Sequence, residues 1–454
     1  MSFLDKHINE NRLPVMDQQT FEKVTNDIGK AKFREELAEY IAEKRPPFPL
    51  KEISPDIMLQ SFKSLKKQDV WQYVKPIDQI TKTIFEKYED YKYPFKEHGL
   101  GLIDAPSIYN DVSNYFHQDL RLNCSSYSFK SPIDVWNHGT AKDIWRCLGP
   151  IWRGINGMKP VMVAGKEELR GGQLNDKSYI SAFRLQTYIA TQFKPNVAKA
   201  VYDMTRAKKV LDTSCGWGDR LAGFYCSNAE EYIGCDPNPN TFERYVKQVK
   251  TYEGLLGNKN TEAIIDTFDK HHIITMDGVK KVTIYRCGAE DLPWDEIDNI
   301  DCAFTSPPYF ATERYNEGGE YVEDQSWSKF NQYELWRDRF FIPVAINSYN
   351  SLSDKGHMFV NIMDPTIKGT RYKSCDELVD ALISPRTLGF PERFKGQIGM
   401  RIMQRPQGRA KFKTKEELDE FMNKLYIENI WCFGKEKLDY FRHARKNTLE
   451  EFFI

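Results

Sequence analysis

The chain has 454 residues, of which 41% are hydrophobic and 13% aromatic, and its 64 Lys and Arg residues are balanced by 65 Asp and Glu residues. This composition excludes a disordered chain, and the length exceeds what one hydrophobic core usually supports, so we expect two folded units. The neutral balance excludes a protein that coats nucleic acid by charge alone, although it is compatible with a local basic surface.

The N-terminal segment and the cysteines bear on location and on metals. Residues 1–12 carry charges where a signal peptide would be apolar, and no run of about 18 uncharged apolar residues occurs. We therefore expect a cytoplasmic protein without a membrane span, which fits a bacterial or a viral setting. The nine cysteines lack a C-x-x-C spacing, and the adjacent His271 and His272 would point apart, so we expect no metal site.

Residues 1–175 are expected to form an N-terminal domain of mixed or mainly helical type. Helical patterns cover Phe21–Glu43, Ile57–Lys67 and Ile77–Tyr88, and the segment Pro46–Pro49 is an internal break. An aromatic, turn-rich stretch with only weak strand signals follows.

Residues 176–454 are expected to form an α/β domain. Short β-branched or apolar runs alternate with helical patterns there, as they do in βαβ units, and this predicts a doubly wound sheet covered on both faces. The seven expected strands are Lys209–Thr213, Glu231–Cys235, Val282–Arg286, Asp301–Thr305, His357–Ile362, Ile398–Gln404 and Glu428–Phe433.

The first of these strands leads into a turn suited to a nucleotide-like cofactor. An acid, Asp212, is followed by Gly216 and Gly218 and then by a helix start. Glycines let the backbone approach a ligand closely. The third glycine of a dinucleotide fingerprint is replaced by Leu221, which favours a cofactor without a pyrophosphate.

The next two strands also end in acidic residues. Asp236 closes the second strand, where a carboxylate can accept both hydroxyls of a ribose. After the third strand, Glu290, Asp291 or the backbone around Ala289 can meet the adenine edge. Each feature alone is an ordinary turn or loop, but the three on successive strand ends predict binding of an adenosyl cofactor.

The fourth strand ends in Ser306-Pro307-Pro308-Tyr309-Phe310. The prolines fix the backbone, so the Ser306 side chain and the Pro307 carbonyl form a rigid pair of acceptors. Such a pair can take the two N–H groups of a base amine and aim its lone pair at a methyl donor. Tyr309 offers a ring face to an extruded base, with Phe310 behind it.

The two motifs Asp212–Gly218 and Thr305–Tyr309 resemble those of the class I amino-methyltransferases that act on cytosine N4 or adenine N6 of DNA. The resemblance covers roughly residues 180–435. It implies a Rossmann-like sheet of seven strands with an antiparallel last strand, S-adenosyl-L-methionine as cofactor, and DNA with a flipped base as substrate. The serine form of the motif is more similar to the cytosine-N4 enzymes, and adenine stays open.

The resemblance also implies further site residues. Phe193 and Pro195 look like the segment that contacts the methionine part of the cofactor, and Ser214 and Thr305 lie within the two motifs. The N-terminal domain is then the candidate for target recognition.

Other functions use similar features. Enzymes that methylate an RNA base or a protein glutamine carry a related loop, more often with Asn or Asp at the position of Ser306, and a non-catalytic module would be expected to lose the loop. A basic run between the last two strands predicts either a grip on phosphates or a solvated loop. Its members are Arg401, Arg405, Arg409, Lys411, Lys413 and Lys415.

Overall fold

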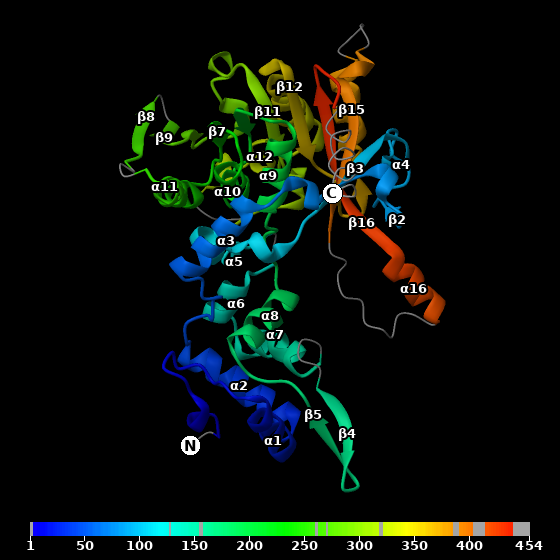
Figure 1. The fold of residues 1–454 in the computed structure, drawn as a ribbon. Coiled ribbons are helices and arrows are strands. Elements are labelled where there is room, and N and C mark those ends of the chain that lie inside the picture. Colours follow the sequence, from blue (N-terminus) through cyan, green and yellow to red (C-terminus); the bar gives the residue numbers. More distant parts are fainter. Residues whose placement is uncertain are drawn as a thin grey trace, which may run out of the picture. The chain divides into compact units, whose positions relative to one another are not determined.

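The computed structural model describes residues 3–126, 129–153, 158–258, 262–268, 271–316, 321–384, 390–402 and 414–438. The chain forms two compact units, which are interleaved along the sequence (Figure 1). The first unit comprises 1–53, 118–191 and 314–319, and the second comprises 54–117, 192–313 and 320–454. We expected one boundary near residue 175, whereas residues 54–117 belong with the second unit. No helix within the described ranges is long and apolar enough to cross a membrane.

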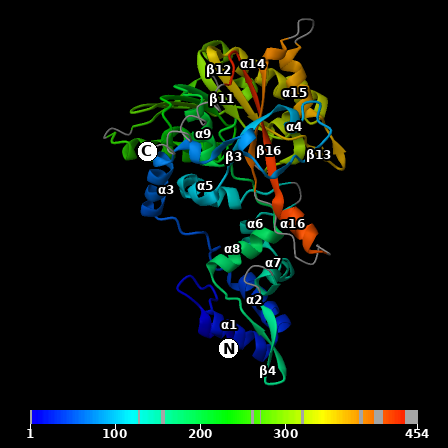
Figure 2. The same ribbon diagram turned by 45° about the vertical axis from the view of Figure 1, so that its right-hand side comes forward.

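The first unit is mainly helical and carries one β-hairpin (Figure 2). The helix expected at Phe21–Glu43 is two helices, because Gly29 between them has φ 83, a conformation that glycine adopts without strain. The core holds edge-to-face aromatic pairs such as Phe33 with Trp152. The elements are α1 (Gln18–Ile28), α2 (Lys30–Lys44), α6 (Pro132–His138), α7 (Ala141–Arg153), β4 (Lys159–Val163), β5 (Lys166–Arg170) and α8 (Asp176–Gln186).

The second unit is built on one large mixed sheet, in which all seven expected strands are confirmed. Five of them, β10, β7, β6, β11 and β12, are parallel neighbours, and β16 lies antiparallel between β12 and β15. The strands are β6 (Lys209–Asp212), β7 (Glu231–Cys235), β10 (Lys281–Tyr285), β11 (Ile300–Thr305), β12 (Leu352–Asn361), β15 (Phe394–Arg401) and β16 (Lys424–Gly434).

Additional strands extend this sheet at both edges. β3 (Gly99–Asp104) pairs with β15, and β1 (Val74–Pro76) pairs with β3. At the other edge β9 (His271–Asp277) joins β10, and β8 (Ile264–Phe268) joins β9.

The prediction of a helix at Ile77–Tyr88 is wrong. That segment holds a short 3-10 turn and β2 (Thr83–Phe85), which pairs in parallel with Lys424–Tyr426 of β16. The β-branched and aromatic residues of β2 suit a strand, and a partner more than 300 residues away overrides the short helical pattern.

Helices cover both faces of the sheet, as a doubly wound fold requires. Alternate residues of β11 face opposite sides: Ala303 packs in the cluster that includes Val344 and Leu378, whereas the Phe304 ring lies 6.3 Å from that of Tyr202. The first face carries α14 (Ile342–Asn350) and α15 (Ser374–Ile383), and the second carries α9 (Pro195–Met204). The unit also contains α3 (Pro55–Lys67), α10 (Asp219–Cys226) and α11 (Pro239–Leu255). Helix α5 (Asp111–Leu122) belongs to it as far as residue 117, and the rest of that helix belongs to the first unit.

Helices α9 and α10 approach each other so closely that only glycine fits at residue 223. A Cβ there would lie 2.6 Å from the Ala198 Cβ and 2.7 Å from the Pro195 carbonyl oxygen. Because part of this contact is backbone, the clash cannot be relieved by a change of rotamer.

We therefore expect Gly223→Ala to lower the free energy of unfolding by about 1–3 kcal/mol through overpacking. Urea denaturation of the full chain measures this value. Gly257→Ala is the matched control, since a Cβ at Gly257 meets no atom within 4 Å and only its φ of 93 is unfavourable. Because the strain at Gly257 is itself destabilising, the outcome that would contradict the close approach of α9 and α10 is a Gly223→Ala variant with the parental free energy of unfolding.

Candidate active site

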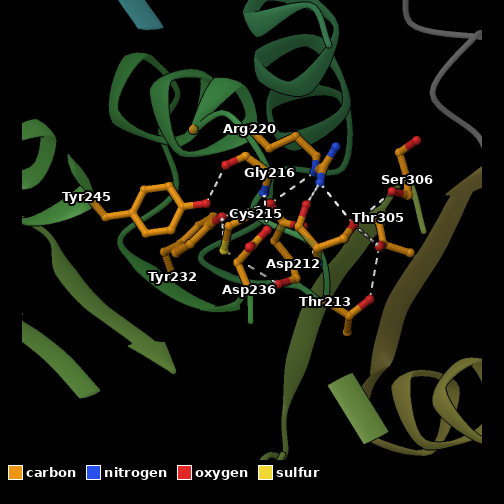
Figure 3. Close-up of polar contacts among 12 residues, drawn as sticks. Asp212, Thr213, Cys215, Gly216, Arg220, Tyr232, Asp236, Tyr245, Thr305 and Ser306 are labelled. Atoms are coloured by element: carbon orange, nitrogen blue, oxygen red, sulfur yellow. Dashed lines mark hydrogen bonds and ion pairs between the residues drawn. The ribbon is translucent and has the colours of Figure 1, made fainter. Parts of the chain in front are cut away.

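The two predicted motifs meet at the carboxyl ends of β6 and β11. These strands are neighbours, and the strand order reverses between them, which is where open α/β sheets bind ligands. Hydroxyl groups join the two loops: Ser214 Oγ lies 2.8 Å from Thr305 Oγ1 and donates to the Ser306 carbonyl oxygen at 2.9 Å (Figure 3). Thr213 Oγ1 also donates to Thr305 Oγ1, at 2.9 Å.

Asp212 is buried, and its carboxylate accepts hydrogen bonds that fix the turn after β6. One carboxylate oxygen accepts from Arg220 Nε at 2.9 Å and from the Tyr232 hydroxyl at 2.7 Å, and the other accepts from the Ser214 amide at 3.1 Å. Burial alone would lower the Arg220 pKa, but the negative charge of Asp212 raises it above its ordinary value. With no exposed surface, Asp212 acts on the site through the loop, as a positioning residue.

The glycine turn presents its backbone to open space. Gly216 has φ 55, and a Cβ there would meet only the Ser214 carbonyl oxygen, at 3.7 Å. Its amide donates to Asp236 at 2.8 Å, and its carbonyl accepts from the Tyr245 hydroxyl. Gly218, with φ 69, is the N-cap residue of helix α10. The turn is therefore rigid and still accessible to a ligand.

Asp236 carries a half-buried carboxylate at the end of β7. Burial raises its pKa to about 6, although hydrogen bonds from the Asn238 and Gly216 amides act in the opposite direction. Donors on a ligand can bind this carboxylate most strongly when it is ionised.

Glu290 lies in the turn after β10, and only one of its carboxylate oxygens is paired. Oε1 accepts from Lys329 Nζ at 2.8 Å, whereas Oε2 is buried without a hydrogen-bond partner. A buried carboxylate oxygen without a donor is costly, and the exocyclic amine of an adenine would satisfy it.

Phe193 and Pro195 flank the same turn. The Phe193 ring lies 5.0 Å from the Arg220 guanidinium carbon and packs edge-on against Phe304. Pro195 is buried at the first position of α9 and packs against Gly223. Phe193 thus lies near the turn, while Pro195 supports the helix behind it.

The Ser306–Phe310 loop is held in an unusual conformation. Pro307 is buried, and Phe310 has φ 49, which costs a non-glycine residue about 1–3 kcal/mol unless its surroundings enforce it. Packing enforces it here, because the Phe310 ring lies 5.7 Å from those of Tyr333 and Trp336. Phe310 lies behind the loop, as expected.

Tyr309 is anchored by two residues that the sequence did not single out. Its hydroxyl donates to the Glu428 carboxylate on β16 and contacts the Asn361 carbonyl oxygen at 3.3 Å. Burial and the nearby Glu428 raise the Tyr309 pKa, so the phenol keeps its proton at neutral pH. No local signal could have found Glu428, because it lies 119 residues from Tyr309 in the chain.

Most of the basic run lies outside the described residues, namely Arg405, Arg409, Lys411 and Lys413. Within the described part, Arg401 ends β15 and pairs with Asp104 at 3.1 Å, and Lys415 is exposed at the start of α16 (Lys415–Asn423). Through β16 and β12, β15 runs parallel to β6, so this connection leaves the sheet at the edge that carries the site. No group of three or more His, Cys, Asp or Glu side chains that could hold a metal is found in the described ranges.

Comparison with known protein families tests the resemblance drawn from the sequence. Residues 300–448 match the DNA methylase family. The match begins at β11, includes the Ser306–Tyr309 loop and covers about a third of the chain. It confirms the resemblance over residues 300–448, including the Ser306–Tyr309 loop, and, with it, S-adenosyl-L-methionine as the cofactor; the Asp212–Gly218 turn lies outside the match. No curated protein matches the chain.

Three solved structures illustrate what else this chain is similar to. Trm1 from Pyrococcus horikoshii, solved with S-adenosyl-L-methionine, is 12% identical with a TM-score of 0.28, over 55% of this chain and 58% of that one. An rRNA methylase from Streptococcus thermophilus is 11% identical with a TM-score of 0.26, over 54% and 100%. A SAM-dependent methyltransferase from Agrobacterium tumefaciens is 14% identical with a TM-score of 0.30, over 63% and 72%. These values are low, so the fold rests on the strand order itself.

The residues at the turn fit the cofactor. No atom but the Ser214 carbonyl oxygen would lie within 4 Å of a Cβ at Gly216, so the backbone is open to a ligand there; Asp236 offers a carboxylate for the ribose, and Glu290 Oε2 lacks a donor. Phe193 lies on the α9 side of the turn.

The ion pair of Asp212 generates the first prediction at this site. Asp212→Asn leaves the buried Arg220 without a compensating charge, so the free energy of unfolding should fall by about 3–5 kcal/mol. Chemical denaturation measures this loss. Combining Asp212→Asn with Arg220→Met removes both charges, and the double variant should lose less than the sum of the two single variants. Additive losses would show that the pair does not act as a unit.

The raised pKa of Asp236 generates the second prediction at this site. Ribose hydroxyls donate to the ionised carboxylate, so the affinity for S-adenosyl-L-methionine should fall as the pH falls through about 6, by about tenfold between pH 7 and pH 5. Titration calorimetry at several pH values measures it. Asp236→Asn, which cannot ionise, should bind more weakly and without this pH dependence; a pH-independent parent would remove Asp236 from the ribose contact.

Proposed function

We propose that the protein transfers a methyl group to the exocyclic amine of a base in DNA, at cytosine N4 or adenine N6. The observation that carries the proposal is the Ser306–Tyr309 loop, which lies beside the cofactor turn and within the part of the chain that matches the DNA methylase family. Amine methylation requires positioned acceptors more than a strong base, and this loop provides them.

Two acceptors would hold the target amine. Ser306 Oγ and the Pro307 carbonyl oxygen would each accept one N–H of the base, which draws the nitrogen towards pyramidal geometry and frees its lone pair. The bond from Ser214 Oγ holds the Ser306 carbonyl, and Pro308 restricts the ψ of Pro307 and so the direction of the Pro307 carbonyl. The loop would therefore be organised before the substrate binds. When bound, S-adenosyl-L-methionine supplies an electrophilic methyl group.

Tyr309 would stack on a base that has left the helix. Its ring cannot swing away, because its hydroxyl is bound to Glu428 and to the Asn361 carbonyl oxygen, which come from two different strands. A base inside a duplex cannot reach such a loop, so the proposal includes base flipping. The carbonyl of Pro307 and the hydroxyl of Ser306 accept from either target amine, and the serine in the motif favours cytosine.

Identifying the methylated product tests the proposal directly. The full chain is incubated with labelled S-adenosyl-L-methionine and, separately, with DNA, RNA and protein, and the modified nucleoside or residue is identified by mass spectrometry. We expect N4-methylcytosine or N6-methyladenine in the DNA sample. Label found only in RNA or on a glutamine would replace the DNA proposal, and a chain that labels nothing while binding the cofactor would support a binding module.

Variants of the loop test the mechanism. Pro307→Ala and Tyr309→Ala should each lower turnover by about 100-fold or more, since a poorly aligned acceptor loses the benefit of positioning, while cofactor affinity stays within about twofold. Single-turnover kinetics and calorimetry measure the two quantities. As a matched control, Tyr372→Phe alters an aromatic residue 5.9 Å behind Phe310 and should leave both unchanged. Parental turnover in both loop variants would overturn the mechanism.

A further inference from the structure

The first unit contains a cluster of cations around residue 149, defined here as the Lys30–Arg34–Arg153 cluster. A Cβ added to Gly149 would lie 2.6 Å from Arg153 Nη2 and 2.7 Å from Arg34 Nη2, so both guanidinium groups lie over the same point of helix α7. Lys30, at the start of α2, is close enough for both arginines to lower its pKa further, beyond the effect of burial. Like charges gathered in this way repel each other.

Arg34 is built into the fold rather than free to move. It is 8% exposed, its Nε donates to the Trp145 carbonyl oxygen at 2.7 Å, and its guanidinium carbon lies 3.5 Å from the centre of the Trp145 ring. Its Nη2 donates to the Arg146 carbonyl oxygen at 3.3 Å. That carbonyl is available because Pro150, four residues later in the helix, has no N–H to donate.

The cluster has no acidic partner in the part of the chain that the structure describes. No ion pair there connects Lys30, Arg34 or Arg153 to a carboxylate, whereas the neighbouring Lys32 on α2 pairs with Glu36 at 3.9 Å. The N-terminus of α2, where Lys30 lies, adds a partial positive charge. The repulsion among these groups is relieved when an anion binds between them.

We propose that the Lys30–Arg34–Arg153 cluster binds a backbone phosphate of the nucleic-acid substrate. The exposed Arg153 guanidinium presents paired N–H groups that match phosphate oxygens, and the Lys30 ammonium adds a second donor. The buried Arg34, whose Nε and Nη2 already donate to carbonyls, adds its charge. In a chain with almost equal numbers of acidic and basic residues, such a cluster gives the first unit a local electrostatic attraction for phosphate. The choice of nucleic acid rests on the proposed function, and the cluster gives the first unit a role in it.

The test is the salt dependence of DNA binding by the full chain. The affinity for a fluorescent duplex of mixed sequence is measured by anisotropy between about 50 and 200 mM salt. Lys30→Ala and Arg153→Ala should each weaken binding and flatten the plot of log affinity against log salt by up to about 0.9, the value for one phosphate, equally on unrelated sequences. Arg153→Lys should recover most of the loss, because it keeps the charge.

Lys32→Ala is the matched control, since Lys32 lies on the same helix, is exposed and is paired with an acid. It should leave the slope unchanged. Parental slopes in Lys30→Ala and Arg153→Ala, or a parent chain that binds no DNA, would overturn the assignment. A parent that binds DNA through the cluster but methylates another substrate would leave the cluster in place and remove the proposed reaction instead, so the two failures are distinguishable.

Discussion

The ion pair between Asp212 and Arg220 is the interaction on which the site depends. Both side chains are buried, so either charge alone would be costly, and the pair fixes the position of the strand end relative to α10. Arg220 also donates from Nη2 to the carbonyl and hydroxyl oxygens of Ser214. Since Ser214 Oγ in turn binds the Ser306 carbonyl, the same ion pair that shapes the cofactor turn also orients the loop proposed to hold the target amine.

The sheet makes this connection geometrically available. The chain runs outwards from β6 to β7 and β10, then returns to add β11 and β12 on the other side of β6. The loops after β6 and β11 therefore leave adjacent strands at the same edge while their helices go to opposite faces. Close packing of α9 on α10 at Gly223 keeps the helix behind the cofactor turn at a fixed depth, which in turn determines where Gly216 exposes its backbone.

Whether a strand or a site residue could be predicted depends on how far apart in the chain its interacting residues lie. All seven expected strands, and the places of Gly216 and Asp236 at strand ends, were found from the sequence, because a buried strand followed by a glycine turn or an acid is a local pattern. The strands between Val74 and Asp104 were missed, because β3 and β2 pair with β15 and β16, which lie about 300 residues away or more, and β1 in turn pairs with β3. Asp212 was expected to bind the cofactor itself, and the structure places it at the end of β6, buried against Arg220. Arg220 is the second residue of α10 and gave no separate signal.

The Ser306–Phe310 loop also illustrates how strain is distributed around a site. It is fixed at its start by Ser214 from the turn after β6, and near its end by Glu428 and Asn361 from β16 and β12. A segment held at both ends cannot relax the positive φ of Phe310, and the aromatic cluster behind Phe310 removes the remaining freedom. The acceptors of Ser306 and Pro307 and the ring of Tyr309 are therefore positioned by separate parts of the sheet. Loss of one anchor should displace one element of the loop and leave the other in place, which is the arrangement expected where alignment rather than acid–base strength limits the chemistry.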